Sequence, residues 1–343
     1  MVSETPPALD GFAMPAEWAP HARCWMAWPC RLGLWGAGFE AACLAYAEAA
    51  RTIARFEPVR MLVPGGLLAM AKLQLGRQAE AMVAEIDDSW TRDTGPTFVL
   101  GADGRLAGVA WRFNGWGNRA HPHERDSRLA AALLAELGLP CYKAPIVLEG
   151  GAVHVDGQGS LLATESSVLN ANRNPTLDRR QVEERLALYL GVRKILWLPH
   201  GLVDDETDGH VDNVACFAGP GRVICAVASL RADRNSGPLA ENRERLAGMR
   251  DATGRRLELI ELPLPRPRDG ATGQLPLSYV NFYIANGGVV MPAFGDPMDE
   301  PARRLLADVF PEREVVQLPA FEIVRGGGGL HCITQQQPRA EAS

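Results

Sequence analysis

The chain of 343 residues lacks the marks of several large protein classes. Its first residues, Met-Val-Ser-Glu-Thr-Pro-Pro, contain neither a basic segment nor an apolar stretch, so we expect no secretory signal. No apolar run approaches the roughly 18 residues of a membrane-spanning helix, so we expect no membrane partner. The zinc-protease motif HEXXH, the serine-hydrolase motif GxSxG and the phosphate-binding loop are absent. A net charge of −6 indicates no broad basic surface for nucleic acid.

The cysteines form no CxxC pair, and their number, seven, is odd. They are Cys24, Cys30, Cys43, Cys141, Cys216, Cys225 and Cys332. This pattern argues against a disulfide framework and against a structural zinc site. We therefore expect reduced thiols, a cytoplasmic location, and neither a metal nor a cofactor.

The chain does contain a recurring order of structural signals. Apolar runs at 96–100 and 106–113 flank the turn Asp103-Gly104, and a helix at 127–138 and a strand at 141–148 follow. The order returns with hairpins at 152–163 and around 219–221 and 286–288, helices at 178–191, 238–249 and 299–310, and strands at 194–198, 257–262 and 314–318. A helix at 39–55, a strand at 59–63 and an insertion at 65–85 complete a fifth unit. Five strand-strand-helix-strand units predict an α/β fold with radial repetition, in a single catalytic domain over 1–343 with an ordered core at about 8–338.

Each unit ends on a polar or glycine-rich segment. The segments carry Asp93, Glu149, His210 with Asp212, Asn281 and, after four glycines, Cys332. If the units surround an axis, these segments converge on one site. His210-Val211-Asp212 has the spacing of a strand, which would put the imidazole and the carboxylate on one face.

Singly, each residue has a simpler interpretation. An exposed strand edge explains His210 and Asp212, a turn explains Asp93 or Glu149, and a buried inert thiol explains Cys332. Together, the residue types suit a guanidinium substrate, because carboxylates bind its planar N–H array in bidentate fashion. Its central carbon is a poor electrophile that needs a thiolate, and a histidine can protonate the leaving nitrogen and then activate water.

Other signals indicate no competing chemistry. The segment 115–120 fits GxGxxA but does not open a helix, which disfavours a dinucleotide site. His121 and His123 indicate a surface loop, since no further ligands follow at close spacing. Cys216 and Cys225 lie in apolar hairpin strands and are expected in the core.

The chain resembles the agmatine deiminases, peptidyl-arginine deiminase-like members of the guanidino-group-modifying pentein superfamily. The similarity is carried by long strings at 10–18, 25–29, 90–96, 148–151, 206–213, 279–283, 295–297 and 329–336. It implies a five-fold pseudosymmetric α/β propeller that converts agmatine and water to N-carbamoylputrescine and ammonia. In two places the chain departs from the family: Gly329 replaces a common asparagine, and 118–123 replaces a segment near the expected pocket mouth.

The resemblance also implies roles for individual residues. Cys332 would attack the guanidinium carbon to form an amidino-cysteine intermediate, and His210 would be the general acid and base. Asp93 and Asp212 would clamp the guanidinium, and Glu149 would position both the substrate and His210. The implied substrate-binding positions are Trp90, Glu206, Asp208 and Gly329, with Glu206 or Asp208 near the distal amine.

Several alternatives stay open from the sequence. Free arginine, peptidyl-arginine or another guanidinoalkyl amine could be the substrate, and a substrate carboxylate would need an arginine such as Arg119 or Arg325. An amidinotransferase, or a non-catalytic binding module on the same fold, would also use this framework. The expected partner is a small cationic guanidino compound, and a homo-oligomer is left open.

Overall fold

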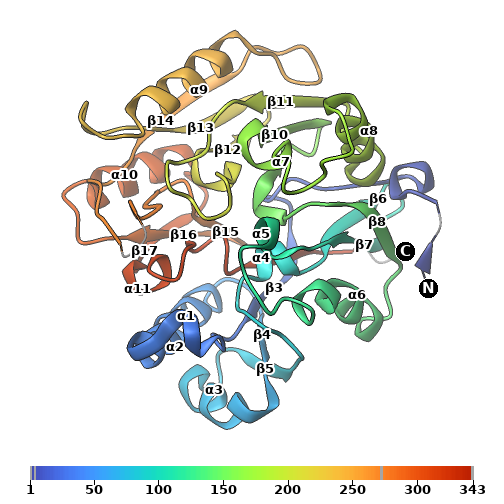
Figure 1. Ribbon diagram of the computed structural model, residues 1–343, viewed down its shortest axis with the longest axis vertical. Helices are drawn as coiled ribbons and strands as arrows, with labels where there is room; N and C mark the ends of the chain where they lie inside the picture. The colour runs from blue at the N-terminus through green and yellow to red at the C-terminus, as the bar shows by residue number, and fades with distance from the viewer. Residues whose placement is uncertain (1, 4, 271–272, 341–343) are drawn as a thin grey trace.

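A computed structural model describes residues 2–3, 5–270 and 273–340 of the chain. Its strands form five small sheets that Figure 1 shows set around a common centre. The first contains β1 (Val2–Ser3), β8 (Cys141–Val147), β7 (Leu106–Arg112), β6 (Thr97–Gly101) and β2 (Phe12–Ala13). The second contains β11 (Lys194–Leu198), β10 (Ser160–Thr164) and β9 (Val153–Val155), and the third contains β12 (Ala215–Gly219), β13 (Arg222–Val227) and β14 (Glu258–Pro263). The fourth contains β15 (Tyr283–Ala285), β16 (Gly288–Ala293) and β17 (Glu314–Pro319), and the fifth contains β18 (Gln335–Pro338), β3 (His21–Ala27), β4 (Val59–Val63) and β5 (Glu80–Val83).

Every sheet repeats the same pairing. An antiparallel pair comes first (β6–β7, β9–β10, β12–β13, β15–β16, β18–β3). The second strand of each pair runs parallel to the strand that follows a helix. In the fifth sheet the antiparallel pair joins β18 to β3, so strands from the two ends of the chain close the ring. The prediction of an α/β fold made of five strand-strand-helix-strand units is confirmed.

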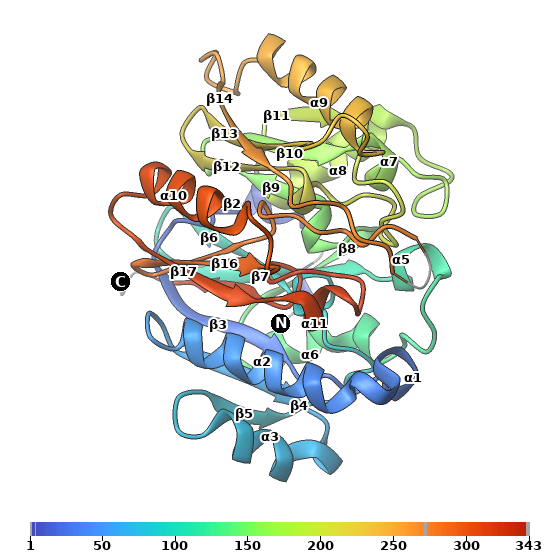
Figure 2. The same ribbon diagram turned by 90° about the vertical axis from the view of Figure 1, so that its left-hand side faces the viewer.

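One long helix connects the parallel strands of each unit. These helices are α6 (Asp126–Glu136), α8 (Arg179–Leu190), α9 (Ser236–Gly248), α10 (Asp299–Val309) and α2 (Phe39–Ile53). Figure 2 shows α9 at the top of the molecule and α2 in its lower half, with α3 (Leu68–Leu75) and β5 beyond α2. Helix α8 begins as the sequence predicts, because Asp178 and Gln181 form a reciprocal capping box, and it ends at Gly191 in the left-handed conformation (φ 67°).

Shorter helices lie in the connections. The α-helical turns are α1 (Leu32–Trp35), α3 (Leu68–Leu75), α4 (Thr91–Thr94), α5 (Gly115–Asn118), α7 (Glu165–Val168) and α11 (Phe321–Val324). The 3-10 turns are η1 (Pro7–Asp10), η2 (Gly36–Gly38), η3 (Gly65–Leu67), η4 (Gly150–Ala152) and η5 (Val211–Asn213). The predicted insertion at 65–85 forms α3 and β5, and β5 extends the fifth sheet beside β4 in parallel.

One local prediction is wrong: His210-Val211-Asp212 is not a strand. Residues Val211–Asn213 form the 3-10 turn η5, because the Val214 N–H donates to the carbonyl of Val211 at 2.9 Å. Val211 and Val214 are both buried, and their spacing of three residues suits such a turn. Cys216 and Cys225 lie in the core, as predicted. Within the described ranges, no helix is long and apolar enough to cross a membrane.

Candidate active site

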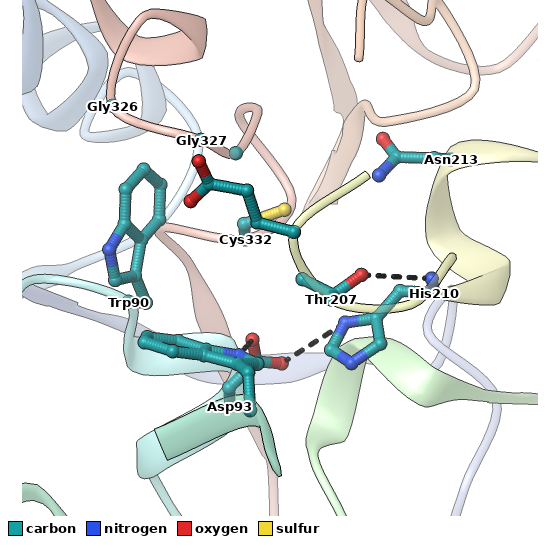
Figure 3. Close-up of a pocket in the computed structure, with 11 residues that line it drawn as sticks. Trp90, Asp93, Thr207, His210, Asn213, Gly326, Gly327 and Cys332 are labelled. Carbon is teal, nitrogen blue, oxygen red and sulfur yellow. Dashed lines mark hydrogen bonds and ion pairs between the residues drawn. The ribbon is translucent and has the colours of Figure 1, made fainter. Parts of the chain in front are cut away.

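The ends of the units meet at the centre of the ring. Asp93 lies in α4, Glu149 precedes η4, His210 and Asp212 lie at η5, and Cys332 follows the glycine run. A pocket opens onto this group (Figure 3). Its lining consists of Trp90, Asp93, Trp116, Glu206, Thr207, His210, Asn213, Gly326, Gly327, Gly328 and Cys332. The ends of the units therefore bring carboxylates, an imidazole and a thiol to one place.

The thiol of Cys332 lies at the buried end of this pocket and is 7% exposed. Its Sγ lies 3.5 Å from Oδ2 of Asp212 and 3.3 Å from Nδ2 of Asn281. Burial and the carboxylates of Asp212 and Asp93 raise the pKa of the thiol well above its ordinary value. A bound cation would act in the opposite direction, since a positive charge beside sulfur favours the thiolate.

The imidazole of His210 is buried among carboxylates. Nδ1 lies 3.8 Å from Oδ1 of Asp93, and Nε2 lies 3.6 Å from Oε2 of Glu149 without a hydrogen-bond partner among the described residues. The N–H of His210 donates to Oγ1 of Thr207 at 3.0 Å, which holds the backbone in place (Figure 3). Burial alone would lower the pKa of His210, but the neighbouring carboxylates, Asp93 foremost, raise it to about 9.

Asp93 is held at both oxygens. Its Oδ1 accepts the N–H of Gly151 at 2.9 Å, and its Oδ2 accepts Nε1–H of Trp116 at 2.8 Å. Burial raises the pKa of Asp93, and the carboxylates of Asp212 and Glu149 add to this effect while His210 opposes it. Trp116 sits on a backbone with φ 53° and ψ 54°, so the irregular turn at α5 aims its indole at the pocket.

Glu149 is anchored by a buried arginine. Nε of Arg173 donates to Oε1 of Glu149 at 2.7 Å, and Nη1 of Arg173 donates to Oδ2 of Asp208 at 2.7 Å. Burial would raise the pKa of Glu149, but His210 and Arg173 hold it below its ordinary value. Arg173 therefore fixes an ionised carboxylate behind His210 and ties it to the loop at 204–209.

The structure separates the residues expected to bind substrate. Trp90 and Glu206 line the pocket, whereas Asp208 and Gly329 do not. The carboxylate of Asp208 is engaged by Arg119, Arg173 and Asn172. Gly329 lies behind Cys332, where an added Cβ would stand 2.2 Å from Oδ1 of Asn281. A side chain at position 329 would therefore collide with Asn281.

Sequence reasoning missed several residues that shape the site. Asn281 contacts the sulfur; it follows the strand at 257–262, but the sequence indicated no role for it. Trp116 lies in the segment that was weighed as a dinucleotide motif. Arg173 stands in the connection between α7 and α8, and no pattern in the sequence pointed to it. Thr207 and Asn213 lie on either side of His210, within the segment 206–213 that carries part of the family resemblance. Their residue types alone indicated no particular role in the pocket.

Comparison with known proteins agrees with this geometry. A family model described as Porphyromonas-type peptidyl-arginine deiminase matches residues 13–338. The agmatine deiminase of Ectopseudomonas mendocina is 43% identical over 363 residues, covering 99% of each chain. That of Pseudomonas aeruginosa is 44% identical over 358 residues, covering 97% of each chain. A solved agmatine deiminase of Enterococcus faecalis superimposes with a TM-score of 0.95 at 34% identity, covering 98% of both chains.

The fold and its relatives define an enzyme that acts on the carbon–nitrogen bonds of guanidino groups. More narrowly, the chain belongs to the Porphyromonas-type peptidyl-arginine deiminase family.

The charge state of His210 gives a first testable prediction. Because its pKa is raised to about 9, the imidazolium is fully present below about pH 6.5 and is lost as the pH rises through about 9. We expect an NMR titration of protein with nitrogen-15-labelled histidine rings to show a midpoint near 9 for His210. The His210→Gln variant identifies the signal. A midpoint at or below that of free histidine would contradict this electrostatic description.

The buried arginine gives a second prediction. Arg173→Gln leaves the buried carboxylate of Glu149 without its arginine, whereas Asp208 keeps its pair with Arg119. We therefore expect the free energy of unfolding to fall by about 3–5 kcal/mol. Chemical denaturation measures this loss. The control is Arg180→Gln, which breaks an exposed ion pair with Glu184 and should change stability by no more than about 0.5 kcal/mol. Equal stability of the two variants would show that Arg173 is not needed to balance these charges.

Proposed function

We propose that the chain hydrolyses agmatine to N-carbamoylputrescine and ammonia through a covalent intermediate on Cys332. The observation that carries the proposal is the charge pattern along the pocket. Its buried lining combines Cys332 with the carboxylate of Asp93, and Asp212 lies 3.5 Å behind the sulfur. The exposed side chain of Glu206 also lines the pocket, beside Gly327. A guanidinium at one end and an ammonium at the other match this pattern.

The mouth also argues against arginine as the substrate. Arg119 donates to the carbonyl of Glu206 at 2.9 Å and pairs with Asp208. Arg325 pairs with Glu322 at 3.4 Å. Neither arginine lines the pocket, so neither cation is placed to receive an α-carboxylate there. The relatives named agmatine deiminase support the same choice.

In the proposed first step, the guanidinium N–H groups bind the carboxylates of Asp93 and Asp212. Oδ1 of Asp212 is buried without a hydrogen-bond partner in the described part of the chain, so it is free to accept one of them. The cation favours release of the thiol proton to solvent, and the thiolate Sγ of Cys332 then bonds to the guanidinium carbon. His210, protonated at neutral pH, donates its proton to the departing nitrogen, which leaves as ammonia.

In the proposed second step, the amidino-thioether is hydrolysed. His210 is now neutral and takes a proton from water as the water oxygen bonds to the same carbon. The carbon–sulfur bond breaks and the thiolate returns. The remaining hydroxyl proton passes to solvent as the carbonyl forms, and N-carbamoylputrescine departs. Glu149 keeps its charge beside His210 through both steps, since Arg173 holds it in place.

A substrate panel tests the proposal. We expect ammonia release from agmatine at the highest kcat/KM, with arginine and peptidyl-arginine far behind. Glu206→Gln should raise KM for agmatine about two- to fivefold, the effect of one exposed ion pair, and leave kcat nearly unchanged. Ammonia release from arginine but not from agmatine would overturn the substrate assignment, although it would still agree with the proposed reaction at Cys332. No turnover of any guanidine by folded protein would overturn both.

A further inference from the structure

A group of buried titratable residues lies next to the site, and the proposed reaction uses none of them. We call Glu17, Arg92, His154 and His331 the buried polar cluster. Their exposed fractions are 3%, 2%, 2% and 3% in that order. None of them lines the pocket, yet His331 precedes Cys332 directly and contacts Asp212.

His331 stands between two carboxylates. Its Nδ1 lies 2.9 Å from Oδ2 of Asp212, and its Nε2 lies 2.8 Å from Oε1 of Glu17. An ionised carboxylate only accepts hydrogen bonds, and a neutral imidazole has a single N–H. A neutral ring would therefore turn a lone pair toward one of the two oxygens. Only the imidazolium donates to both.

The other charged groups around His331 are compatible with this state. Burial and Arg92 lower the pKa of His331, but Glu17 and Asp212 raise it above its ordinary value. The positive charge of Arg92 is balanced by Glu17, because Nη1 of Arg92 lies 3.3 Å from Oε1 of Glu17. The ring of His154 lies 6.4 Å from that of His331, and its Nδ1 accepts the N–H of Phe217. The proton of a neutral His154 is then on Nε2, which faces Glu17 at 3.4 Å.

This arrangement acts on both oxygens of Asp212. Oδ2 lies 2.9 Å from Nδ1 of His331, from which it accepts a hydrogen bond, and 3.5 Å from Sγ of Cys332. Oδ1 remains without a partner among the described residues. We propose that His331 is a positioning residue, held as an imidazolium between Glu17 and Asp212. It fixes Asp212 so that Oδ1 is left for a guanidinium N–H, and it offsets the negative charge that Asp212 places beside the sulfur.

The guanidinium part of this inference rests on the proposed function, whereas the charge of His331 and its effect on the thiol do not. A direct test is NMR of protein with nitrogen-15-labelled histidine rings, with His331→Asn to identify the signal. We expect both ring nitrogens of His331 to be protonated at neutral pH. A neutral His331 would overturn the proposal.

Glu17→Gln tests whether the charge matters for turnover. The amide keeps the shape of the side chain but removes the negative charge that offsets Arg92 beside His331. The pKa of His331 should therefore fall, so that its titration midpoint lies within the pH range in which the enzyme can be assayed. The ratio of variant to wild-type kcat/KM for agmatine should then drop at least about tenfold as the pH rises through that midpoint, the effect of about one pKa unit. A ratio that stays constant across the midpoint would overturn the positioning role. The matched control is Glu241→Gln, which alters an exposed pair with His200 at 2.8 Å.

Alkylation of Cys332 gives a readout that needs neither agmatine turnover nor a folded Glu17 variant. The His331→Asn variant keeps an N–H donor near Asp212 but removes the positive charge. Loss of that charge raises the pKa of the Cys332 thiol. We expect iodoacetamide to modify the Cys332 peptide at least about tenfold more slowly than in wild type near pH 8. His200→Asn should match wild type. An unchanged rate in His331→Asn would overturn the effect on sulfur, and if agmatine is not turned over at all, this assay and the NMR still decide the charge state.

Discussion

Replacing Cys332 by alanine is expected to end ammonia release from agmatine, with kcat lowered by about 10⁴-fold or more. Sγ of Cys332 is the one thiol that lines the pocket within the described residues, and the buried carboxylates beside it cannot replace a sulfur nucleophile at a weakly electrophilic carbon. The assay is ammonia release under saturating agmatine.

The same variant should still bind substrate. The carboxylates of Asp93 and Asp212 remain, and Trp90 and Trp116 line the pocket, so quenching of tryptophan fluorescence by agmatine reports binding. Cys30→Ala is the control, because Cys30 is only half-buried and lies outside the pocket. Activity in Cys332→Ala, or its loss in Cys30→Ala, would assign the nucleophile elsewhere.

Gly151→Ala is expected to lower kcat/KM for agmatine at least about 10²-fold, the scale on which small misplacements of catalytic groups act. An added Cβ would stand 2.7 Å from Nδ1 of His210 and 2.8 Å from Oδ2 of Asp212. It would also stand 3.0 Å from Oδ1 of Asp93, so the methyl group falls among the imidazole of His210 and the two carboxylates. Each of these groups must move to admit it.

A matched glycine separates this effect from a general loss of stability. Gly237 lies in α9 with nothing within 4 Å of an added Cβ, so Gly237→Ala should keep full activity and gain up to about 1 kcal/mol of stability. Gly151→Ala should lose activity while remaining folded, at a cost of about 1–3 kcal/mol from overpacking. Full activity in folded Gly151→Ala would mean that the three polar groups are not held as described.

Much of the fold follows from the sequence because each unit carries its own local signals. The capping box of α8 and its terminal glycine act within a few residues, and the turns that join the hairpins do the same. The repetition of the unit then predicts something that no single unit shows: the segments that end the five units lie close together. Asp93, Glu149, His210, Asp212 and Cys332 come together for this reason.

What the sequence could not give depends on partners distant along the chain. Glu17 meets His331 only because β3 and β18 close the ring from opposite ends. Arg173 finds Glu149 through a loop without periodicity. The error at His210-Val211-Asp212 has a local cause: alternation suggested a strand, but the burial of Val211 and Val214 three residues apart favours a turn.

The most direct test of the central claim is to capture the bond between Cys332 and the substrate carbon. Wild-type protein is mixed with excess agmatine, quenched in acid during the first turnovers, digested and analysed by mass spectrometry. We predict that the peptide containing Cys332 gains the mass of agmatine less ammonia, and that the adduct decays as N-carbamoylputrescine forms. Ammonia release with an unmodified Cys332 peptide at every time point, or an adduct on another cysteine, would contradict the account.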